Sequence, residues 1–270
     1  MNTLEQQLAG QSLQASLAQL VDRIRSQPAD ADLRAAFTQL LCLEGNWTRA
    51  QAQLKSWLAL APQAQPTVTL LEQTIQGELT REKVLAGEAR PTMPEAHWPW
   101  VAQLVNALAQ PEVAASASRQ AALEQAEAVS GELTLQDGTT HTFDWLMDGD
   151  SRFGPVCELI VNGRYFWLPF NAIEEMEFQP PASVTDLTWR HTRVQLRDGS
   201  EQVCQIPARY PVDAQTEDRF RLGRTTEWQP LAGDDAQYIG QGQKVWLNDS
   251  AEFPLLDLAR VRFTGAAADE

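Results

Sequence analysis

The chain has 270 residues, of which 43% are hydrophobic and 21% charged, so it can bury the core of one large or two ordinary globular domains. Its 21 basic and 36 acidic residues give a formal net charge of −15, which disfavours nucleic-acid and anionic-membrane partners because phosphate binding needs clustered Lys and Arg. Met1–Gln11 lacks a basic region followed by an apolar one, and no apolar run approaches the roughly 18 residues of a membrane span, so we expect a cytoplasmic protein.

The N-terminal half of the sequence predicts helices. Residues 1–130 are rich in Ala, Leu and Gln, and apolar residues recur in them at helical spacing. Proline and glycine interrupt this pattern at Pro28, Gly45-Asn46 and Pro62. The expected helices are Leu13–Arg25, a second that Asp30 or Asp32 caps, Thr48–Leu60 and about Pro66–Glu78.

A repeat signal relates these helices. Pro28 and Pro62 each follow an amphipathic helix and are 34 residues apart, which is the tetratricopeptide period. Ala50 and Leu54 occupy the small and large positions of the second helix of that repeat, where a small residue lets neighbouring helices approach closely. The first helix of the unit departs from the pattern, so an ordinary bundle of two antiparallel helix pairs is the alternative.

Prolines and aromatic residues change the character of the chain between Arg90 and Pro111. His97, Trp98 and Trp100 cluster in this segment. A further helix is expected over Pro111–Val129, and its many alanines suggest that it packs against the repeat helices.

From Gly131 onward the hydrophobic pattern alternates with period two, which predicts strands. Three hairpins are expected, because Asp-Gly or Asn-Gly separates two alternating runs in each. Their turns are Asp137-Gly138, Asn162-Gly163 and Asp198-Gly199, and later strands are expected at Val245–Leu247 and Leu258–Phe263. The predicted fold class is α+β, with a helical tetratricopeptide-like domain over 1–130 followed by a mainly antiparallel β domain over 131–270.

The densest polar motif is Asp148–Pro155. Its carboxylates Asp148 and Asp150 could bind Ca²⁺ or serve as acid and base, so a hydrolase or metal-dependent enzyme built on this loop is the rival functional interpretation. A calcium loop needs more oxygen ligands and a terminal Glu, whereas Arg152 supplies a competing cation. We therefore favour an Asp150–Arg152 ion pair across a tight turn, with the motif in a connection between strands.

The rest of the sequence also lacks a complete catalytic or metal-binding motif. Cys42, Cys157 and Cys204 lack zinc, redox or disulfide spacing, which predicts buried thiols in a reducing compartment. The three histidines have no Cys, Asp or Glu at ligand spacing, and Gly240-Gln241-Gly242 lacks the third glycine of a dinucleotide fingerprint and is interpreted as a turn. We therefore expect neither a metal nor a cofactor.

The order of the C-terminal motifs resembles the ImpE/SciE family, also called TagJ. The motifs are Phe143-Asp144-Trp145, Asp148–Pro155, Glu158, Asn162–Phe170, Asp186–Trp189, Pro207–Pro211, Arg224–Trp228 and Gly240–Lys244. The resemblance covers nearly the whole chain. It departs at Val184-Thr185, where family members usually have Leu-Arg, and at Lys244, where Arg is usual.

This family consists of accessory proteins of bacterial type VI secretion systems, so the resemblance implies a cytoplasmic accessory factor and not an enzyme. It also implies contact with the small subunit of the contractile sheath, and a link to sheath recycling by the AAA+ ATPase. It assigns no role to the motif residues Asp148, Asp150, Arg152, Arg209, Tyr210, Arg224 and Trp228. A helical repeat agrees with this class, because it presents an extended surface for a partner helix.

The partner is expected on the helical half. Gln39 and Leu43 are the first candidates, because they lie on the inward-facing helix of the better-formed repeat. Trp98 and Trp100 are the second candidate anchor, because large aromatics often dominate binding energy. Ordinary core packing is the alternative for all four side chains.

Overall fold

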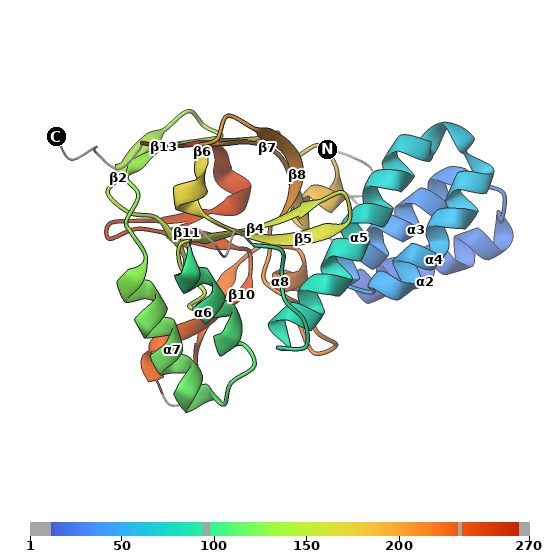
Figure 1. The fold of residues 1–270 in the computed structure, drawn as a ribbon. Coiled ribbons are helices and arrows are strands. Elements are labelled where there is room, and N and C mark those ends of the chain that lie inside the picture. The colour runs from blue at the N-terminus through green and yellow to red at the C-terminus, as the bar shows by residue number, and fades with distance from the viewer. Residues whose placement is uncertain (1–11, 94–97, 232–233, 265–270) are drawn as a thin grey trace.

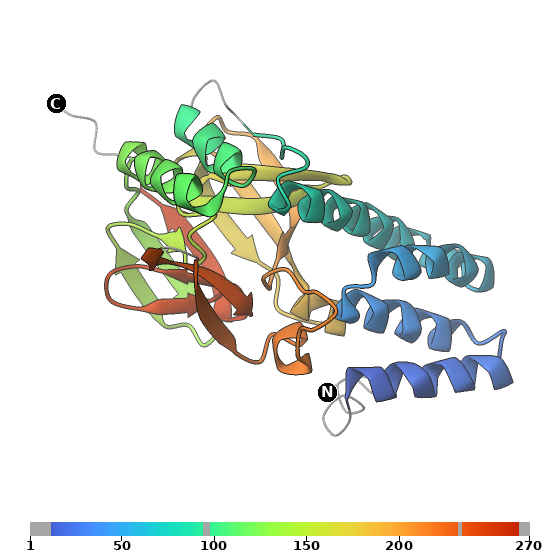
Figure 2. The same cartoon turned by 90° about the horizontal axis from the view of Figure 1, so that it is seen from below.

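The structure is a computed structural model that describes residues 12–93, 98–231 and 234–264. Helices α2–α5 form a row that leans against one side of a curved sheet, and a helical hairpin, α6–α7, lies at another side (Figures 1 and 2). The N-terminal half is helical and the C-terminal half is mainly β, which confirms the predicted α+β class. His97 and Met1–Gln11 lie outside the described residues.

The row of helices matches the sequence prediction except at its end, because its last helix extends further than predicted. It consists of α2 (Leu13–Ser26), α3 (Ala31–Glu44), α4 (Trp47–Leu60) and α5 (Gln65–Leu85), each packed on the next. The side chains of Ser12, Asp30 and Asn46 cap the first three helices by accepting a backbone N–H of the first turn. Gly45 ends α3 in the left-handed conformation, with φ of 81°, which confirms the predicted break.

Three features of the helical half differ from the sequence prediction. Helix α5 continues past Glu78 to Leu85, because the chain first turns into the left-handed region at Gly87. Helix α6 (Pro99–Ala107) was not predicted, although Pro99 suits a first turn, where its missing N–H costs no hydrogen bond. Helix α7 (Glu112–Gln125) packs mainly on α6 and on strand β10 (Asp234–Gly242), and not on the repeat helices as predicted.

The largest sheet has eight strands in the order β2-β1-β13-β6-β7-β8-β4-β5, with antiparallel neighbours. Its strands are β1 (Gly131–Leu135), β2 (Thr140–Phe143), β4 (Val156–Val161), β5 (Arg164–Pro169), β6 (Ile173–Phe178), β7 (Trp189–Leu196), β8 (Glu201–Pro207) and β13 (Leu258–Phe263). The predicted hairpins β1–β2, β4–β5 and β7–β8 are confirmed. Between β4 and β5, Asn162 and Gly163 both have positive φ, as a two-residue hairpin turn requires.

Two small sheets complete the β half. One contains β3 (Met147–Asp148), β11 (Val245–Leu247) and β12 (Glu252–Pro254), and the other pairs β9 (Thr226–Leu231) with β10. The prediction that Gly240-Gln241-Gly242 forms a turn is wrong, since these residues end strand β10. Gly240 is needed there for close packing, because a Cβ atom at this position would lie 2.2 Å from Cε2 of Tyr210.

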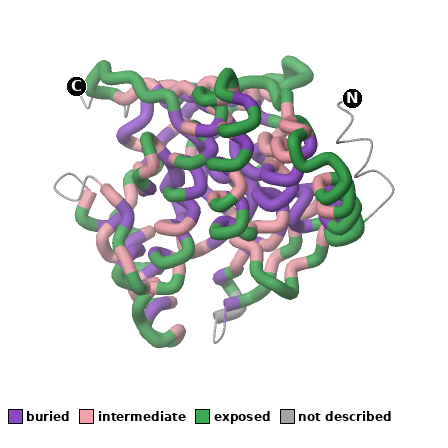
Figure 3. Tube along the Cα trace, turned by 90° about the vertical axis from the view of Figure 1, so that its right-hand side faces the viewer, coloured by how far each residue is buried: buried purple, intermediate pink, exposed green. Residues whose placement is uncertain are grey.

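One hydrophobic core joins the helices to the sheet. It includes Leu41 and Leu54 of the helices together with Ile160 and Trp167 of the sheet. A Cβ atom on Gly77 of α5 would lie 2.4 Å from Cγ2 of Ile160, so this glycine lets the helix approach β4. The boundary near residue 130 therefore separates helices from strands, but this core contains residues from both sides of it. Buried segments of the chain run through the middle of the molecule (Figure 3).

A second core fills the opposite face of the sheet, with Leu133, Phe170, Met176 and Trp246 among its members. The short helix α8 (Asp218–Arg221) lies beside the row of helices, and Asp218 accepts the backbone N–H of Leu13 at 2.7 Å. Across the described ranges, no helix combines the length and the apolar character that crossing a membrane requires.

Candidate functional site

Charged side chains gather in the interior where α5 meets the sheet. We call this set the buried charge cluster; it consists of Glu78, Arg81, Asp148, Glu158 and Lys244. Each of these five residues is at most 3% exposed to solvent. They come from α5, β3, β4 and the residue before β11, so the cluster connects segments that are far apart in the sequence.

Arg81 ties the row of helices to the sheet. Its Nε and Nη2 donate to the two carboxylate oxygens of Glu158, at 2.6 and 3.0 Å. Its Nη1 lies 3.4 Å from Oε2 of Glu78, and Nη2 also donates to the backbone carbonyl of Arg209 at 3.1 Å. A bidentate guanidinium–carboxylate pair fixes orientation as well as distance, so it sets how α5 lies on β4.

Lys244 is shared by two carboxylates. Its Nζ lies 2.5 Å from Oδ2 of Asp148 and 2.8 Å from Oε2 of Glu158. The hydroxyl of Tyr210 donates to the other oxygen of Asp148 at 2.8 Å, and that of Tyr165 donates to Glu158 at 2.5 Å. Each buried charge therefore has both an ionic partner and hydrogen bonds, which is the condition under which a charge can be buried at tolerable cost.

The turn next to the cluster contains the predicted ion pair. Arg152 donates through Nε and Nη2 to Asp150, at 2.9 and 2.6 Å, and its backbone N–H donates to the same carboxylate at 3.0 Å. The backbone N–H of Gly240 donates to the second oxygen of Asp150 at 3.1 Å. The interpretation of Asp148–Pro155 as a connection held by an Asp150–Arg152 pair is therefore confirmed.

Two arginines of the β half bind the C-terminal end of α3. Arg209 donates to the carbonyl oxygens of Leu43 and Cys42, at 2.6 and 2.9 Å, and Arg221 donates to the carbonyl of Glu44. The last carbonyls of a helix lack partners inside the helix and carry partial negative charge. Arg209, a residue of the sequence motifs, thus caps a helix of the other half.

The remaining motif residues pack around the same turn. Trp228 is half-buried, and its ring meets Tyr210 edge-on with centroids 5.8 Å apart. A Cβ atom on Gly149 would lie 2.3 Å from the Trp228 ring, so the glycine makes room for the indole. Arg224 is exposed.

Burial and pairing shift the pKa values of the cluster in opposite directions. Burial by itself raises the pKa of Glu158, but Arg81 and Lys244 outweigh it and lower that pKa from 4.5 to about 2. Burial raises the pKa of Asp148 to about 6, against the opposing effect of Lys244. Of these two carboxyls, Asp148 is therefore the first to take up a proton on acidification.

The pKa of Glu158 predicts a pH dependence of stability. Because its folded-state pKa lies below the ordinary 4.5, ionised Glu158 contributes stability that is complete above pH 4.5 and is lost as the pH falls toward 2. Between about pH 5 and pH 3, the wild-type chain should lose about 2 kcal/mol more unfolding free energy than Glu158→Gln. Urea titrations at both pH values measure this difference. Equal losses in the two chains would contradict it, and Glu72→Gln on the exposed side of α5 is the control that should follow the wild type.

The carboxylates of Asp148 and Asp150 have no oxygen available to bind a substrate or a cation. Both oxygens of Asp148 and both of Asp150 accept hydrogen bonds, and the two residues are 3% and 0% exposed. A substrate or cation could reach them only if the bonds to Lys244 and Arg152 broke. Within the described part of the chain, no three His, Cys, Asp or Glu side chains come together as metal ligands.

The cysteines are buried as predicted. Burial raises the pKa of Cys42 and Cys204 to about 12, so these thiols are protonated at neutral pH and are poor nucleophiles. His191 lies beside Gln205, with 2.9 Å between Nδ1 and the amide nitrogen, and His141 packs against Phe253.

The structure separates the predicted partner-binding residues by accessibility. Leu43 is fully buried, and Trp100 is 4% exposed. Gln39 on α3 and Trp98 before α6 are half-buried. A partner can reach Gln39 and Trp98 without opening the core, whereas Leu43 and Trp100 would require it; binding at any of the four stays a prediction.

The sequence interpretation missed Glu78 and Arg81 as members of the cluster. Both lie on α5, beyond or at the end of the predicted helix. A signal was present in β4, where Glu158 is the one charged residue of the run Val156–Val161. A carboxylate inside a strand that is buried along its length needs a cationic partner, and this requirement points to a buried Arg or Lys elsewhere in the chain.

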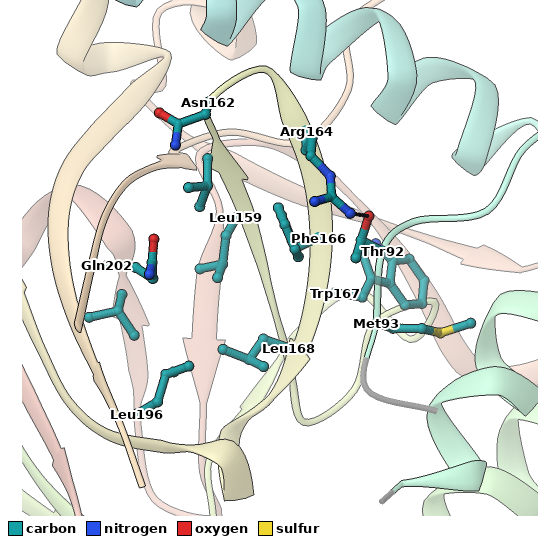
Figure 4. Close-up of a pocket in the computed structure, with 12 residues that line it drawn as sticks. Thr92, Met93, Leu159, Asn162, Arg164, Phe166, Trp167, Leu168, Leu196 and Gln202 are labelled. Carbon is teal, nitrogen blue, oxygen red and sulfur yellow. Dashed lines mark hydrogen bonds between the residues drawn. The ribbon is translucent and has the colours of Figure 1, made fainter. Parts of the chain in front are cut away.

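An open apolar pocket is a second feature that the sequence did not predict. It lies between the β4–β5 and β7–β8 hairpins and has a volume of about 530 Å³ (Figure 4). We call it the hairpin pocket. Its lining residues are Thr92, Met93, Leu159, Val161, Asn162, Arg164, Phe166, Trp167, Leu168, Val194, Leu196 and Gln202.

Comparison with known proteins places the chain in a family. The crystal structure of a protein from Vibrio parahaemolyticus has the same fold, with a TM-score of 0.85 and 27% identity over 100% of both chains. The family model described as ImpE protein matches residues 140–262. The type VI secretion system accessory component TagJ of Pseudomonas aeruginosa is 36% identical over 264 residues, which cover 96% of this chain and 90% of that protein. The chain therefore belongs to the ImpE/TagJ family, and the resemblance inferred from its motifs is confirmed.

Proposed function

We propose that this chain is a non-enzymatic accessory component of a bacterial type VI secretion system and acts as an adaptor that binds the small subunit of the contractile sheath. The observation that carries the proposal is the 36% identity, along 96% of the chain, to a protein named as such an accessory component. The sheath subunit as partner comes from the family resemblance of the C-terminal motifs.

The geometry supports binding over catalysis. The polar groups of the motifs are used inside the fold: Asp148, Glu158 and Lys244 hold the cluster together, and Arg209 caps α3. A partner can reach groups at the surface, which include the half-buried Gln39 and Trp98 and the open hairpin pocket.

The rival proposal is a hydrolase or metal-dependent enzyme that uses Asp148 and Asp150. Both carboxylates are enclosed and bound by cations, as described above, whereas a general acid or base must reach the proton that it transfers. The adaptor is therefore the function that the geometry supports best.

The test is a calorimetric titration of the purified chain with the purified small sheath subunit from the same secretion system. We expect saturable 1:1 binding with a dissociation constant in the micromolar range or tighter. A flat titration, together with no retention of the sheath subunit on the immobilised chain, would overturn the proposal. Hydrolytic or metal-dependent activity that Asp150→Asn abolishes in a folded variant would favour the rival.

The link to the AAA+ ATPase and the cellular location belong to the same proposal. We expect the chain in the cytoplasmic fraction, and we expect it to change the rate at which the ATPase disassembles sheaths in a reconstituted reaction. Recovery of the chain from another fraction, or an unchanged rate at saturating chain, would contradict these parts.

A further inference from the structure

The hairpin pocket is the open end of the second hydrophobic core. Its buried lining residues Leu159 and Val194 belong to that core. Four further lining residues pack against the core and are partly exposed, namely Val161, Phe166, Leu168 and Leu196. The interior of an eight-stranded barrel is filled either by side chains or by one small ligand. In this curved eight-stranded sheet, side chains leave a hollow of about 530 Å³, which is within the range of small-molecule sites.

Strand β5 gives the pocket a polar end and an apolar end. Its residues Arg164, Phe166 and Leu168 share one face of the strand, because alternate side chains point the same way, and they span roughly 13 Å. Arg164 and Asn162 lie at the β4–β5 turn, whereas Leu168 and Leu196 lie toward the other end of the pocket (Figure 4). The shape therefore suits an elongated ligand with a polar head at the turn and an apolar tail along β5.

Arg164 supplies a positive charge for that head. It is the charged residue of the lining, and it is exposed. Its guanidinium lies 5.1 Å from the centroid of the Phe166 ring and donates to Thr92 Oγ1 at 3.3 Å, which holds it beside the pocket. Among the described residues no acidic side chain pairs with Arg164, although the chain has 36 acidic residues. A ligand carboxylate can therefore bind this guanidinium without breaking an ion pair of the protein.

The edge of the sheet beside the pocket is already paired. Strand β5 is the last strand of the sheet, and the Thr92 N–H donates to the carbonyl of Tyr165 at 2.9 Å. The Trp167 N–H donates to the carbonyl of Thr92 at 3.0 Å. These bonds occupy the main-chain groups that an added peptide strand would need, so the pocket offers a ligand apolar side chains and the Arg164 charge.

We propose that the hairpin pocket binds a medium-chain acyl carboxylate of the fatty-acid class. The carboxylate pairs with Arg164, and the acyl chain lies along Phe166 and Leu168 toward Leu196. Binding removes apolar surface of both the ligand and the pocket from water, which is the main favourable contribution. This activity goes beyond the adaptor function and does not depend on it.

The experiment is a calorimetric titration of the full chain with decanoate below its micellar concentration. We expect saturable one-to-one binding in the micromolar range. Leu168→Gln and Leu196→Gln place an amide in the apolar end and should each weaken binding about tenfold or more. Val203→Gln is the matched control, because Val203 is 55% exposed on β8, next to Gln202, and does not line the pocket. It should bind decanoate as the wild type does.

The role of the charge is tested with decanol, which has the same chain length and no carboxylate. Arg164→Gln should weaken decanoate binding about two- to fivefold, as expected for an exposed ion pair, and should leave decanol binding unchanged. The loss should shrink as salt is added. Arg25→Gln, which removes the same charge from the exposed face of α2, should alter neither ligand's binding.

The place of binding has its own readout in the methyl NMR spectrum. Decanoate should shift the methyl resonances of Leu159 and Val194, which line the pocket. It should leave those of Leu41 and Leu54 in place, because they belong to the core on the other face of the sheet. Shifts of equal size in both pairs would contradict binding in the hairpin pocket.

The remaining outcomes separate this site from the adaptor function. A flat titration of the wild-type chain, or adsorption of many decanoate molecules without saturation, overturns the site. Equal affinities of Leu168→Gln, Leu196→Gln and Val203→Gln also overturn it. Sheath-subunit binding that Leu168→Gln abolishes, in a chain that does not bind decanoate, would make the pocket a protein-binding surface and overturn the acyl ligand. A chain that binds decanoate as described but no sheath subunit supports the site and removes the adaptor function alone.

Discussion

Replacing Glu158 by Gln should lower the free energy of unfolding at neutral pH by about 3 kcal/mol. The side chain keeps its shape, but Arg81 and Lys244 lose a shared counter-ion in a region from which water is excluded. Removing one partner of a buried ion pair typically costs about 3–5 kcal/mol. The lowering of the Glu158 pKa from 4.5 to about 2 leads to a similar figure of ~3 kcal/mol. Chemical denaturation followed by tryptophan fluorescence measures the change.

A double-mutant cycle with Arg81→Met tests the cause. If the pair accounts for the loss, the double variant should be more stable than the sum of the two single losses predicts, because no unpaired charge of this pair remains. Arg260→Gln is the control. Arg260 lies on strand β13 and forms an ion pair with Glu177 on β6, and its side chain is 44% exposed. This substitution should destabilise the chain far less than Glu158→Gln does, because an exposed ion pair is weakened by water and salt. A loss in Glu158→Gln no larger than in Arg260→Gln would contradict the assigned role of the cluster.

The second large effect is expected at Arg209. Arg209→Met should destabilise the chain by about 2–4 kcal/mol, because the carbonyls of Cys42 and Leu43 would lose a buried charged donor that no water can replace. The loss should also loosen the helices, since Arg209 reaches across from the β half. Hydrogen exchange should therefore speed up in α3 and its neighbours α2 and α4 more than in strands β7 and β8.

The exposed Arg224 supplies the control for this prediction. Arg224→Met removes the same charge from the β half, and we expect a smaller loss than in Arg209→Met because the side chain of Arg224 is exposed. Uniform acceleration of exchange in helices and strands of Arg209→Met would show that the arginine stabilises the whole fold without any particular role at α3.

The amino-acid sequence by itself determined the local structure of this protein. Asp30 caps α3 and Gly45 ends it, because a side-chain acceptor and a residue that tolerates positive φ suffice for these roles without distant contacts. The hairpin turns at Asp137-Gly138 and Asn162-Gly163 depend on the same kind of local preference. The Asp150–Arg152 pair was predictable because its members are two residues apart in a turn. The family followed from the order of the motifs.

Only the tertiary structure decided which side chains from distant segments meet. Arg81 and Glu158 are 77 residues apart, and Lys244 and Asp148 are 96 residues apart, so no local pattern connects them. Their pairing arises because α5 packs on β4 through Gly77 and β11 pairs with β3. The strand at Gly240–Gly242 was mistaken for a turn because Gly240 makes room for the Tyr210 ring and Gly242 for the backbone of Thr225. Neither contact follows from the neighbours of these glycines in sequence. The hairpin pocket is likewise a property of the fold, since alternation along a strand shows that one face is apolar but not whether the rest of the chain covers it.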